Sequence, residues 1–205
     1  MNESPRDFEL VSPLTTEIQN LSPTFQWNTS EDPEESEITY ELHLADNSYY
    51  NDAEIISGIS SNSYNYENQL QDNTLYFWKV KAIDGDNMVK WSSPENSHFY
   101  TNIQNDPPST FSLTGPANEE IISGFLPNLE WSESSDPDPN DLLSYIIYYG
   151  TDPNFSEGSY LEVTNIQNTS YQITNQLDPD KIYYWKVKVT DQIGLSEWSD
   201  EADWW

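Results

Sequence analysis

Apolar and polar residues alternate with a period of two along several short segments of the chain. The segment "YFWKVKA" begins at Tyr76, and every second residue from there is apolar or aromatic while two lysines lie between. The segment "YYWKVKV", from Tyr183, repeats this pattern, and "YELHL" and "YIIYY", from Tyr40 and Tyr145, alternate in the same way. A period of two is typical of half-buried β-strands. Because breaks rich in Asn, Asp, Ser and Pro separate these segments, the pattern predicts an all-β protein with antiparallel strands.

The chain contains one domain type twice. Trp27 in "LSPTFQW" matches Trp131 in "FLPNLEW", and the two lysine-bearing segments match each other. The offset between matching residues drifts only from 103, at Pro5, to 107, at Trp91, so the insertions are small and fall in loops. A repeat of this kind decides the architecture before any single motif does.

A length of 205 residues suits two domains of about 100 residues each. We expect a first sandwich over residues 1–101, a linker over 102–108 and a second sandwich over 109–205. The linker contains paired prolines, which favour an extended and fairly stiff backbone. The first copy continues through "SHFYT" beyond its last tryptophan, whereas the second stops at Trp205. We therefore expect the last strand of the second copy to be clipped, and the chain to be a segment of a longer protein.

Three features resemble fibronectin type III domains: a Trp on the second strand, a Tyr-x-aliphatic pattern on the third, and a Leu-x-Pro-x-x-x-Tyr motif entering the sixth. The last motif is "LDPDKIY" in the second copy and "LQDNTLY" in the first, where Asp72 replaces the proline. The resemblance covers nearly all of both copies and is closest to the type found in secreted microbial proteins. It implies two consecutive immunoglobulin-like antiparallel β-sandwiches of about seven strands each. The residues expected to build the two cores are Trp27, Leu70, Tyr76 and Trp78, and Trp131, Leu177, Tyr183 and Trp185.

Charge and composition exclude several classes of function. The chain has 36 Asp and Glu against 7 Lys and Arg, for a net charge of −29, which argues against nucleic acid or an anionic membrane as a partner. It has no Cys, so disulfides, thiolate metal sites and cysteine nucleophiles are excluded. No apolar run is long enough to span a membrane, and the first residues lack the pattern of a signal peptide.

The sequence does not predict an enzyme. Its two histidines, His43 and His98, both lie in the first copy, and no G-x-S-x-G, H-E-x-x-H or glycine-rich phosphate loop is present. Carboxylates are abundant, but glycosidase chemistry needs two of them at a set separation in a cleft. We therefore expect no catalytic residues and no required cofactor.

Calcium is the one metal that the sequence suggests. Carboxylate and amide oxygens cluster in the loop "SDPDPND" of the second copy and, less densely, in "SEDPEES" of the first. The candidate ligands are Asp136, Asp138, Asn140 and Asp141 in the second copy, and Asp32 and Glu34 in the first. Such hard oxygen ligands suit Ca²⁺, although the spacing is not that of an EF-hand. The alternative is that the Asp-Pro steps form turns and that the charges are simply solvated.

The outward face of the lysine-bearing strands has two interpretations. The lysines can relieve repulsion in an acidic protein by pairing across the sheet with residues such as Glu37 and Glu41. Alternatively, Phe77, Tyr148 and Tyr184 form an aromatic platform for sugar rings or a protein partner.

These observations favour a non-catalytic spacer or adhesion segment of a larger extracellular or cell-surface microbial protein. Its partners would be the flanking domains of the longer chain, with no nucleic acid and no membrane insertion. The alternative is a module that binds polysaccharide or a surface protein through its outward sheet face or loop tips, stiffened by Ca²⁺.

Overall fold

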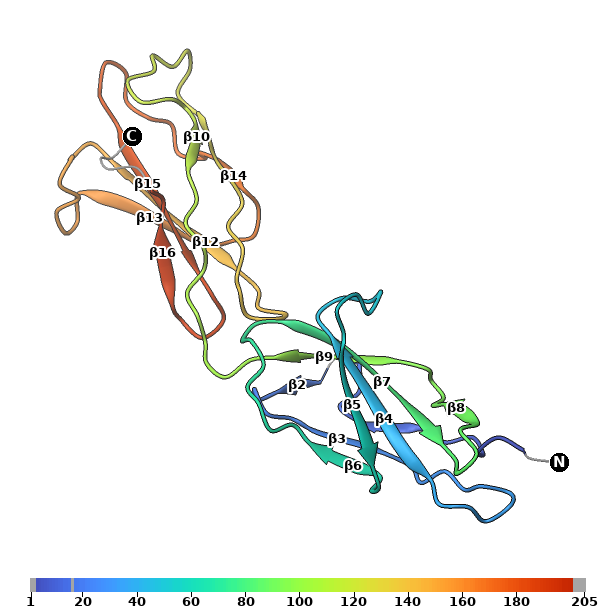
Figure 1. Cartoon of the computed structure of the whole chain (residues 1–205). Coiled ribbons are helices and arrows are strands. Elements are labelled where there is room, and N and C mark those ends of the chain that lie inside the picture. The colour runs from blue at the N-terminus through green and yellow to red at the C-terminus, as the bar shows by residue number, and fades with distance from the viewer. Residues whose placement is uncertain (1–2, 16, 201–205) are drawn as a thin grey trace. The chain divides into compact units, whose positions relative to one another are not determined.

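A computed structural model of the chain describes residues 3–15 and 17–200 and contains two β-sandwich units (Figure 1). Unit 1 comprises Met1–Gln104 and unit 2 comprises Asn105–Trp205, so the division falls inside the segment 102–108 that the sequence suggested as the linker. The prediction of an all-β protein built from two antiparallel sandwiches is confirmed. Within the described ranges, no helix is long and apolar enough to cross a membrane.

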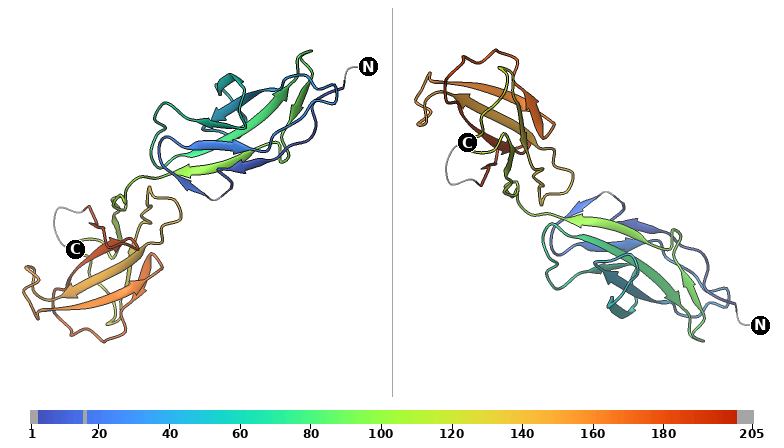
Figure 2. Two further views of the ribbon diagram at one scale, coloured as in Figure 1. Left: turned by 90° about the horizontal axis from the view of Figure 1, so that it is seen from below. Right: turned by 90° about the horizontal axis from the view of Figure 1, so that it is seen from above.

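The described part of unit 1 contains nine strands in two facing sheets (Figure 2). The strands are β1 (Leu10–Ser12), β2 (Ile18–Gln19), β3 (Thr24–Trp27), β4 (Thr39–Ala45), β5 (Glu54–Ile59), β6 (Ser63–Asn65), β7 (Leu75–Ile83), β8 (Val89–Trp91) and β9 (Ser97–Thr101). One sheet has the order β1-β3-β6 and the other β2-β9-β7-β4-β5, with β8 also paired to β7. The count exceeds the predicted seven because Pro13 lies between β1 and β2 and Pro94 between β8 and β9, and proline cannot donate to a strand ladder.

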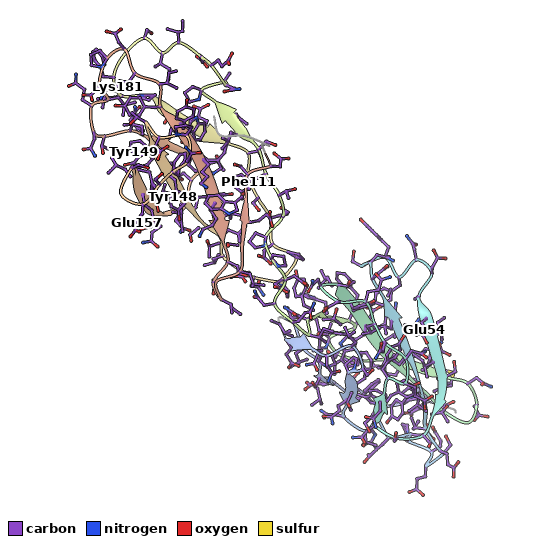
Figure 3. All side chains as sticks on the ribbon, turned by 90° about the vertical axis from the view of Figure 1, so that its left-hand side faces the viewer. Glu54, Phe111, Tyr148, Tyr149, Glu157 and Lys181 are labelled. Carbon is purple, nitrogen blue, oxygen red and sulfur yellow. The ribbon has the colours of Figure 1, made fainter. Side chains whose placement is uncertain are left out.

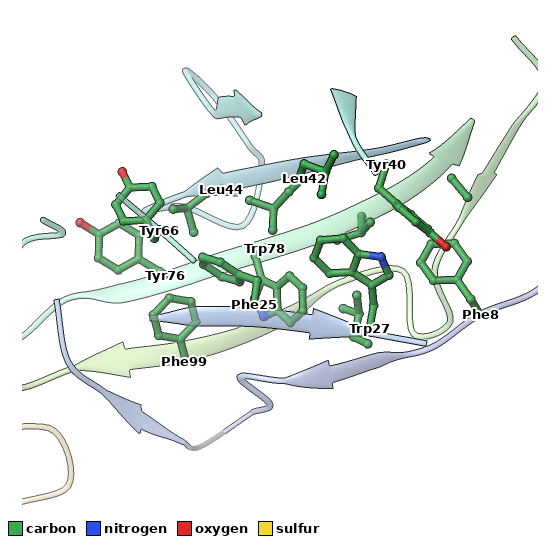
Figure 4. Packing of buried hydrophobic residues seen from close by; sticks show 14 of the residues in the cluster. Phe8, Phe25, Trp27, Tyr40, Leu42, Leu44, Tyr66, Tyr76, Trp78 and Phe99 are labelled. Atoms are coloured by element: carbon green, nitrogen blue, oxygen red, sulfur yellow. The ribbon is translucent and has the colours of Figure 1, made fainter. Parts of the chain in front are cut away.

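The core of unit 1 lies between these two sheets and is rich in aromatic residues (Figure 4). Along β7, every second side chain from Tyr76 to Ala82 is buried, as the alternating pattern predicts. Trp27 from the smaller sheet is 1% exposed and packs against the ring of Tyr40 at 5.3 Å. Trp78 is fully buried, and its indole N–H donates to the carbonyl of Pro13 at 2.8 Å. The polar edge of this buried ring is thereby satisfied.

Unit 2 has the same two-layer plan. Its strands are β10 (Leu113–Gly115), β11 (Asn128–Trp131), β12 (Ser144–Gly150), β13 (Tyr160–Ile166), β14 (Ser170–Gln172), β15 (Tyr184–Thr190) and β16 (Ser196–Trp198). One sheet has the order β10-β11-β14 and the other β13-β12-β15-β16. Trp131 and Trp185 are buried in a separate core made only of residues of this unit. The expected clipping of its last strand concerns residues 201–205, which lie outside the described part of the chain.

Matching tyrosines fix matching loops in the two units. The hydroxyl of Tyr76 accepts the amide of Gln71, and that of Tyr183 accepts the amide of Asp178, both at 3.0 Å. Leu70 and Tyr76 are buried, whereas their counterparts Leu177 and Tyr183 are only half-buried. The same hydrogen bond therefore fixes the same loop in both units, although the residues around it are more exposed to solvent in unit 2.

One edge segment differs between the copies. In unit 1, Ile18 pairs in parallel with Tyr100 of β9. The matching residue of unit 2 is Ile121, in the connection between β10 and β11, and it is 96% exposed. In unit 2, the connection from β10 to β11 thus exposes Ile121, whereas the equivalent segment of unit 1 pairs with a strand.

Candidate metal centre

Three carboxylates of unit 2 lie close enough together to share one cation. Asp136 and Asp141 come from the loop between β11 and β12, and Asp191 directly follows β15. One carboxylate oxygen from each lies within 4.8 Å of those of the other two. The sequence singled out Asp136 and Asp141 but missed Asp191. The signal was present, since Asp191 in the second copy matches Asp84 in the "DGDN" segment of the first.

Asp191 is buried and held rigidly. Its Oδ1 accepts the amides of Ile193 and Leu195, both at 2.9 Å, and its Oδ2 accepts the side-chain amide of Asn105 at 2.6 Å. Burial raises the pKa of Asp191, but the hydrogen bonds from Asn105 and from the backbone amides outweigh it and leave this pKa below its usual value. The side chain is therefore a fixed, ionised carboxylate.

The pKa of Asp136 is shifted in the opposite direction from that of Asp191. Its Oδ1 accepts the amide of Asp138 at 2.9 Å, while its Oδ2 is buried and has no hydrogen-bond partner within the described structure. Burial raises the pKa of Asp136, and the neighbouring carboxylates of Asp141, Asp138 and Asp191 raise it further. A partly buried anion beside other anions is unfavourable, and a bound cation would offset that repulsion.

Asp141 joins the two loops. Its Oδ1 accepts the amide of Leu142 at 2.8 Å and that of Gln192, from the other loop, at 3.2 Å. Asp136 and Asp141 also line an open hollow of about 580 Å³, so the carboxylates can be reached from solvent. The geometry combines a fixed set of oxygen atoms with access for an ion.

The other two predicted ligands of this loop have different roles. Asp138 is buried, and its Oδ2 accepts the amide of Asp106 at 2.7 Å, so it holds the first residues of unit 2. Asn140 is exposed and has a φ of 67°, which fits a turn residue. Neither belongs to the group of three carboxylates.

In unit 1, the predicted ligands Asp32 and Glu34 differ in burial and in their hydrogen bonds. Asp32 is 7% exposed, and its Oδ2 accepts both the amide of Ser36, at 2.8 Å, and its hydroxyl, at 2.7 Å. These two bonds lower the pKa of Asp32. Glu34 is exposed, and one of its oxygens accepts the amide of Glu3 at 3.3 Å.

The outward aromatic residues do not share one plane. Tyr148 on β12 is half-buried, in contrast to its buried neighbour Tyr149 (Figure 3), and its ring meets that of Tyr160 at an interplanar angle of 63°. Lys186 Nζ lies 5.9 Å from the centroid of Tyr148 and 4.0 Å from that of Trp198. Burial, together with the charge of Lys188, lowers the pKa of Lys186 to about 8.

The other two predicted platform residues lie apart from this cluster. Tyr184 pairs with Gly150 at the opposite end of β12 from Ser144, and Phe77 belongs to unit 1, where its ring lies 5.6 Å from that of His98. Within unit 2, Tyr148 stands opposite Lys186 rather than Tyr184. A ligand on unit 2 would therefore meet a lysine set among rings rather than a flat surface.

The fold defines a class: two immunoglobulin-like β-sandwiches in tandem. Residues 10–101 match the family described as "Rha78A-like, N-terminal immunoglobulin domain". The chain is also similar to the crystal structure of chicken CNTN1 FN1–FN3 domains, with 14% identity over 98% of this chain and 68% of that one and a TM-score of 0.35. No curated protein matches the chain. A fold of this class serves as a structural or binding module in many unrelated proteins.

Proposed function

We propose that the chain is a non-catalytic spacer segment of a larger extracellular microbial protein, in which unit 2 is braced by a divalent cation. The observation that carries the proposal is that each unit closes its own core, with Trp27 and Trp78 in one and Trp131 and Trp185 in the other. A spacer needs modules that stay folded without help from their neighbours. The resemblance of both units to fibronectin type III domains supports the extracellular setting.

The connecting segment supports a spacer because little of it is loose. The amide of Ile103 donates to Asp72 of unit 1 at 3.1 Å, and the amide of Asp106 donates to Asp138 of unit 2 at 2.7 Å. Only residues 104 and 105 lie between these two tethered amides, and the side chain of Asn105 is itself bound to Asp191. A connection this short has few conformations to sample.

The cation would act on the same segment. Asp191, which holds Asn105, is one of the three grouped carboxylates, and Asp138, which holds Asp106, lies in the same loop as the other two. Asp136, Asp141 and Asp191 would supply the protein ligands, and carbonyl oxygens or water would complete the six to eight positions that Ca²⁺ takes. Binding would fix the two loops and, through them, the first residues of unit 2.

Single-molecule energy transfer tests the spacer role. The chain has no Cys, so Glu67→Cys in unit 1 and Glu162→Cys in unit 2, both at exposed positions, provide the two thiols to which a donor and an acceptor dye are attached. We expect a narrow distribution of transfer efficiencies in 1 mM CaCl₂, a concentration on the order of the Kd values of extracellular calcium modules. A matched control is the Asp136→Asn variant, whose distribution should be broad in both Ca²⁺ and EDTA. A broad distribution for the labelled chain that keeps Asp136, measured with Ca²⁺, would contradict a spacer role.

A further inference from the structure

Unit 1 has a loop arrangement similar to that around the three grouped carboxylates of unit 2. Ser36 stands where unit 2 has Asp141. Each follows a residue with positive φ, Glu35 at 63° and Asn140 at 67°. The hydroxyl of Ser36 accepts the amide of Gly85 at 3.4 Å, just as Asp141 accepts the amide of Gln192. The two side chains thus bridge the same pair of loops.

Asp84 is the counterpart of Asp191. Each directly follows the long lysine-bearing strand of its unit. The Oδ1 of Asp84 accepts the amides of the residues two and four positions later, Asp86 at 2.9 Å and Met88 at 2.8 Å. Asp191 receives the same two bonds from residues 193 and 195. With Asp32 in the place of Asp136, two of the three carboxylates are therefore present in unit 1.

Asp32 and Asp84 each have one carboxylate oxygen that has no hydrogen-bond partner in the described structure. Asp32 and Asp84 are 7% and 5% exposed, and Asp32 Oδ1 and Asp84 Oδ2 are buried without a hydrogen-bond partner. Ser36 connects them, since its hydroxyl donates to Asp32 and accepts from the residue after Asp84. A bound cation would satisfy both of these oxygens, and neither Asp32 nor Asp84 takes part in an ion pair among the described residues.

We propose that unit 1 holds a second site for a hard divalent cation, with Asp32 and Asp84 as ligands, and that this site is weaker than the one in unit 2 because Ser36 replaces the carboxylate of Asp141. The inference rests on the proposed cation site of unit 2 for its geometry. Unit 1 offers two carboxylates and unit 2 offers three, and affinity for Ca²⁺ rises with the charge of the ligand set. Position 36 in unit 1, and position 141 in unit 2, would then set the order in which the two sites fill.

Calcium titration by calorimetry, after removal of divalent ions, tests the proposal on the whole chain. We expect two sites of different affinity. Asp84→Asn should abolish the weaker one and leave the tighter one unchanged, and Asp86→Asn, in the same loop but exposed, is the matched control. Ser36→Asp should tighten the weaker site by about tenfold, because it restores the third carboxylate. Asp141→Ser should weaken the tighter site to the level of unit 1.

The outcomes separate this inference from the proposed function. A single site that is lost in Asp136→Asn and unaffected by Asp84→Asn would overturn the unit 1 site and leave that of unit 2 standing. Heat signals absent from the unaltered chain would overturn both. Because Ser36 is exposed, Ser36→Asp should fold, and far-ultraviolet circular dichroism checks this. If a folded Ser36→Asp variant binds no more tightly than the parent, the role assigned to position 36 is wrong.

Discussion

Lys81 Nζ lies 2.7 Å from Glu41 Oε1 on the outward face of the larger sheet of unit 1. The two residues are direct cross-strand partners on β4 and β7, and His43 Nε2 lies 2.7 Å from the same carboxylate oxygen. The sequence anticipated this pairing of glutamate and lysine. The neighbouring Lys79 instead sits over the rings of Tyr50 and Trp91, at 4.4 and 4.5 Å.

Replacing Glu41 with Gln should lower the free energy of unfolding of unit 1 by about 1–2 kcal/mol at pH 7. Burial raises the pKa of Glu41, but hydrogen bonds from Lys81, His43 and Ser57 lower it to about 2. A carboxyl with a depressed pKa stabilises the fold above its unfolded pKa and loses that contribution as pH falls through its folded pKa. The difference between parent and variant in urea denaturation should therefore shrink between about pH 4.5 and 2. Glu37→Gln, on an exposed neighbour, is the matched control.

Removing the hydroxyl of Tyr40 should destabilise unit 1 alone. This oxygen accepts the buried amide of Ser30 at 2.8 Å, and Phe would leave that amide without a partner. The expected cost is about 1–3 kcal/mol. Tyr145→Phe is the matched change in unit 2, where the acceptor serves Ser134 at 2.9 Å. Hydrogen exchange followed by mass spectrometry should show faster exchange confined to the altered unit, and exchange that rises equally in both units would contradict the separation of the cores.

Calcium affinity in unit 2 should fall at a higher pH than that of an ordinary aspartate site. Burial and neighbouring carboxylates raise the pKa of Asp136, so a proton competes with the cation sooner as pH falls. Without the cation, ionisation of Asp136 destabilises the folded state, because the pKa of Asp136 is raised there. The free energy of unfolding of the metal-free protein should therefore decrease as pH rises through this pKa. Asp136→Asn should abolish both trends. Calcium titrations and urea denaturation in EDTA, between pH 4 and 7, measure them.

Lys186 should make the stability of unit 2 rise with pH in alkaline solution. Burial lowers the pKa of Lys186 to about 8, so above this pH the folded state loses a proton that the unfolded state keeps up to its ordinary value of 10.5. Stability therefore increases with pH between these two values. Lys186→Met should remove the increase, as measured by the difference in unfolding free energy between parent and variant at pH 7 and 10. An unchanged pH profile in the variant would show that Lys186 is solvated like any surface lysine.

The fold was readable from the sequence because the information is local. Trp78 and Trp185 lie within strands in which the alternation of apolar and polar residues predicts which side chains face the core. Because the domain occurs twice, each prediction can be compared with the matching residue of the other copy. The group of three carboxylates was readable only in part. Asp136 and Asp141 lie five residues apart, but Asp191 reaches them across 50 residues of chain through the pairing of β12 with β15.

The role of Ser36 could not be read from the sequence for a related reason. A serine in a loop does not by itself indicate a binding site. The structure shows that the Ser36 hydroxyl accepts the amide of Gly85 in the same way as the Asp141 carboxylate accepts the amide of Gln192. Likewise, the sequence predicted that Leu177 and Tyr183 belong to the core because they match Leu70 and Tyr76. The structure shows that matching positions in the two copies reach different degrees of burial.

The closure of a separate core within each unit has a consequence for how such a chain can change over generations. After a duplication, a substitution in the loops of one copy leaves the core packing of the other copy unchanged, because each core is built from residues of one unit. Ser36 and Asp141 record one such divergence on a shared scaffold. Two copies that began with the same loop can thus diverge in their loop residues while their tryptophans stay in place.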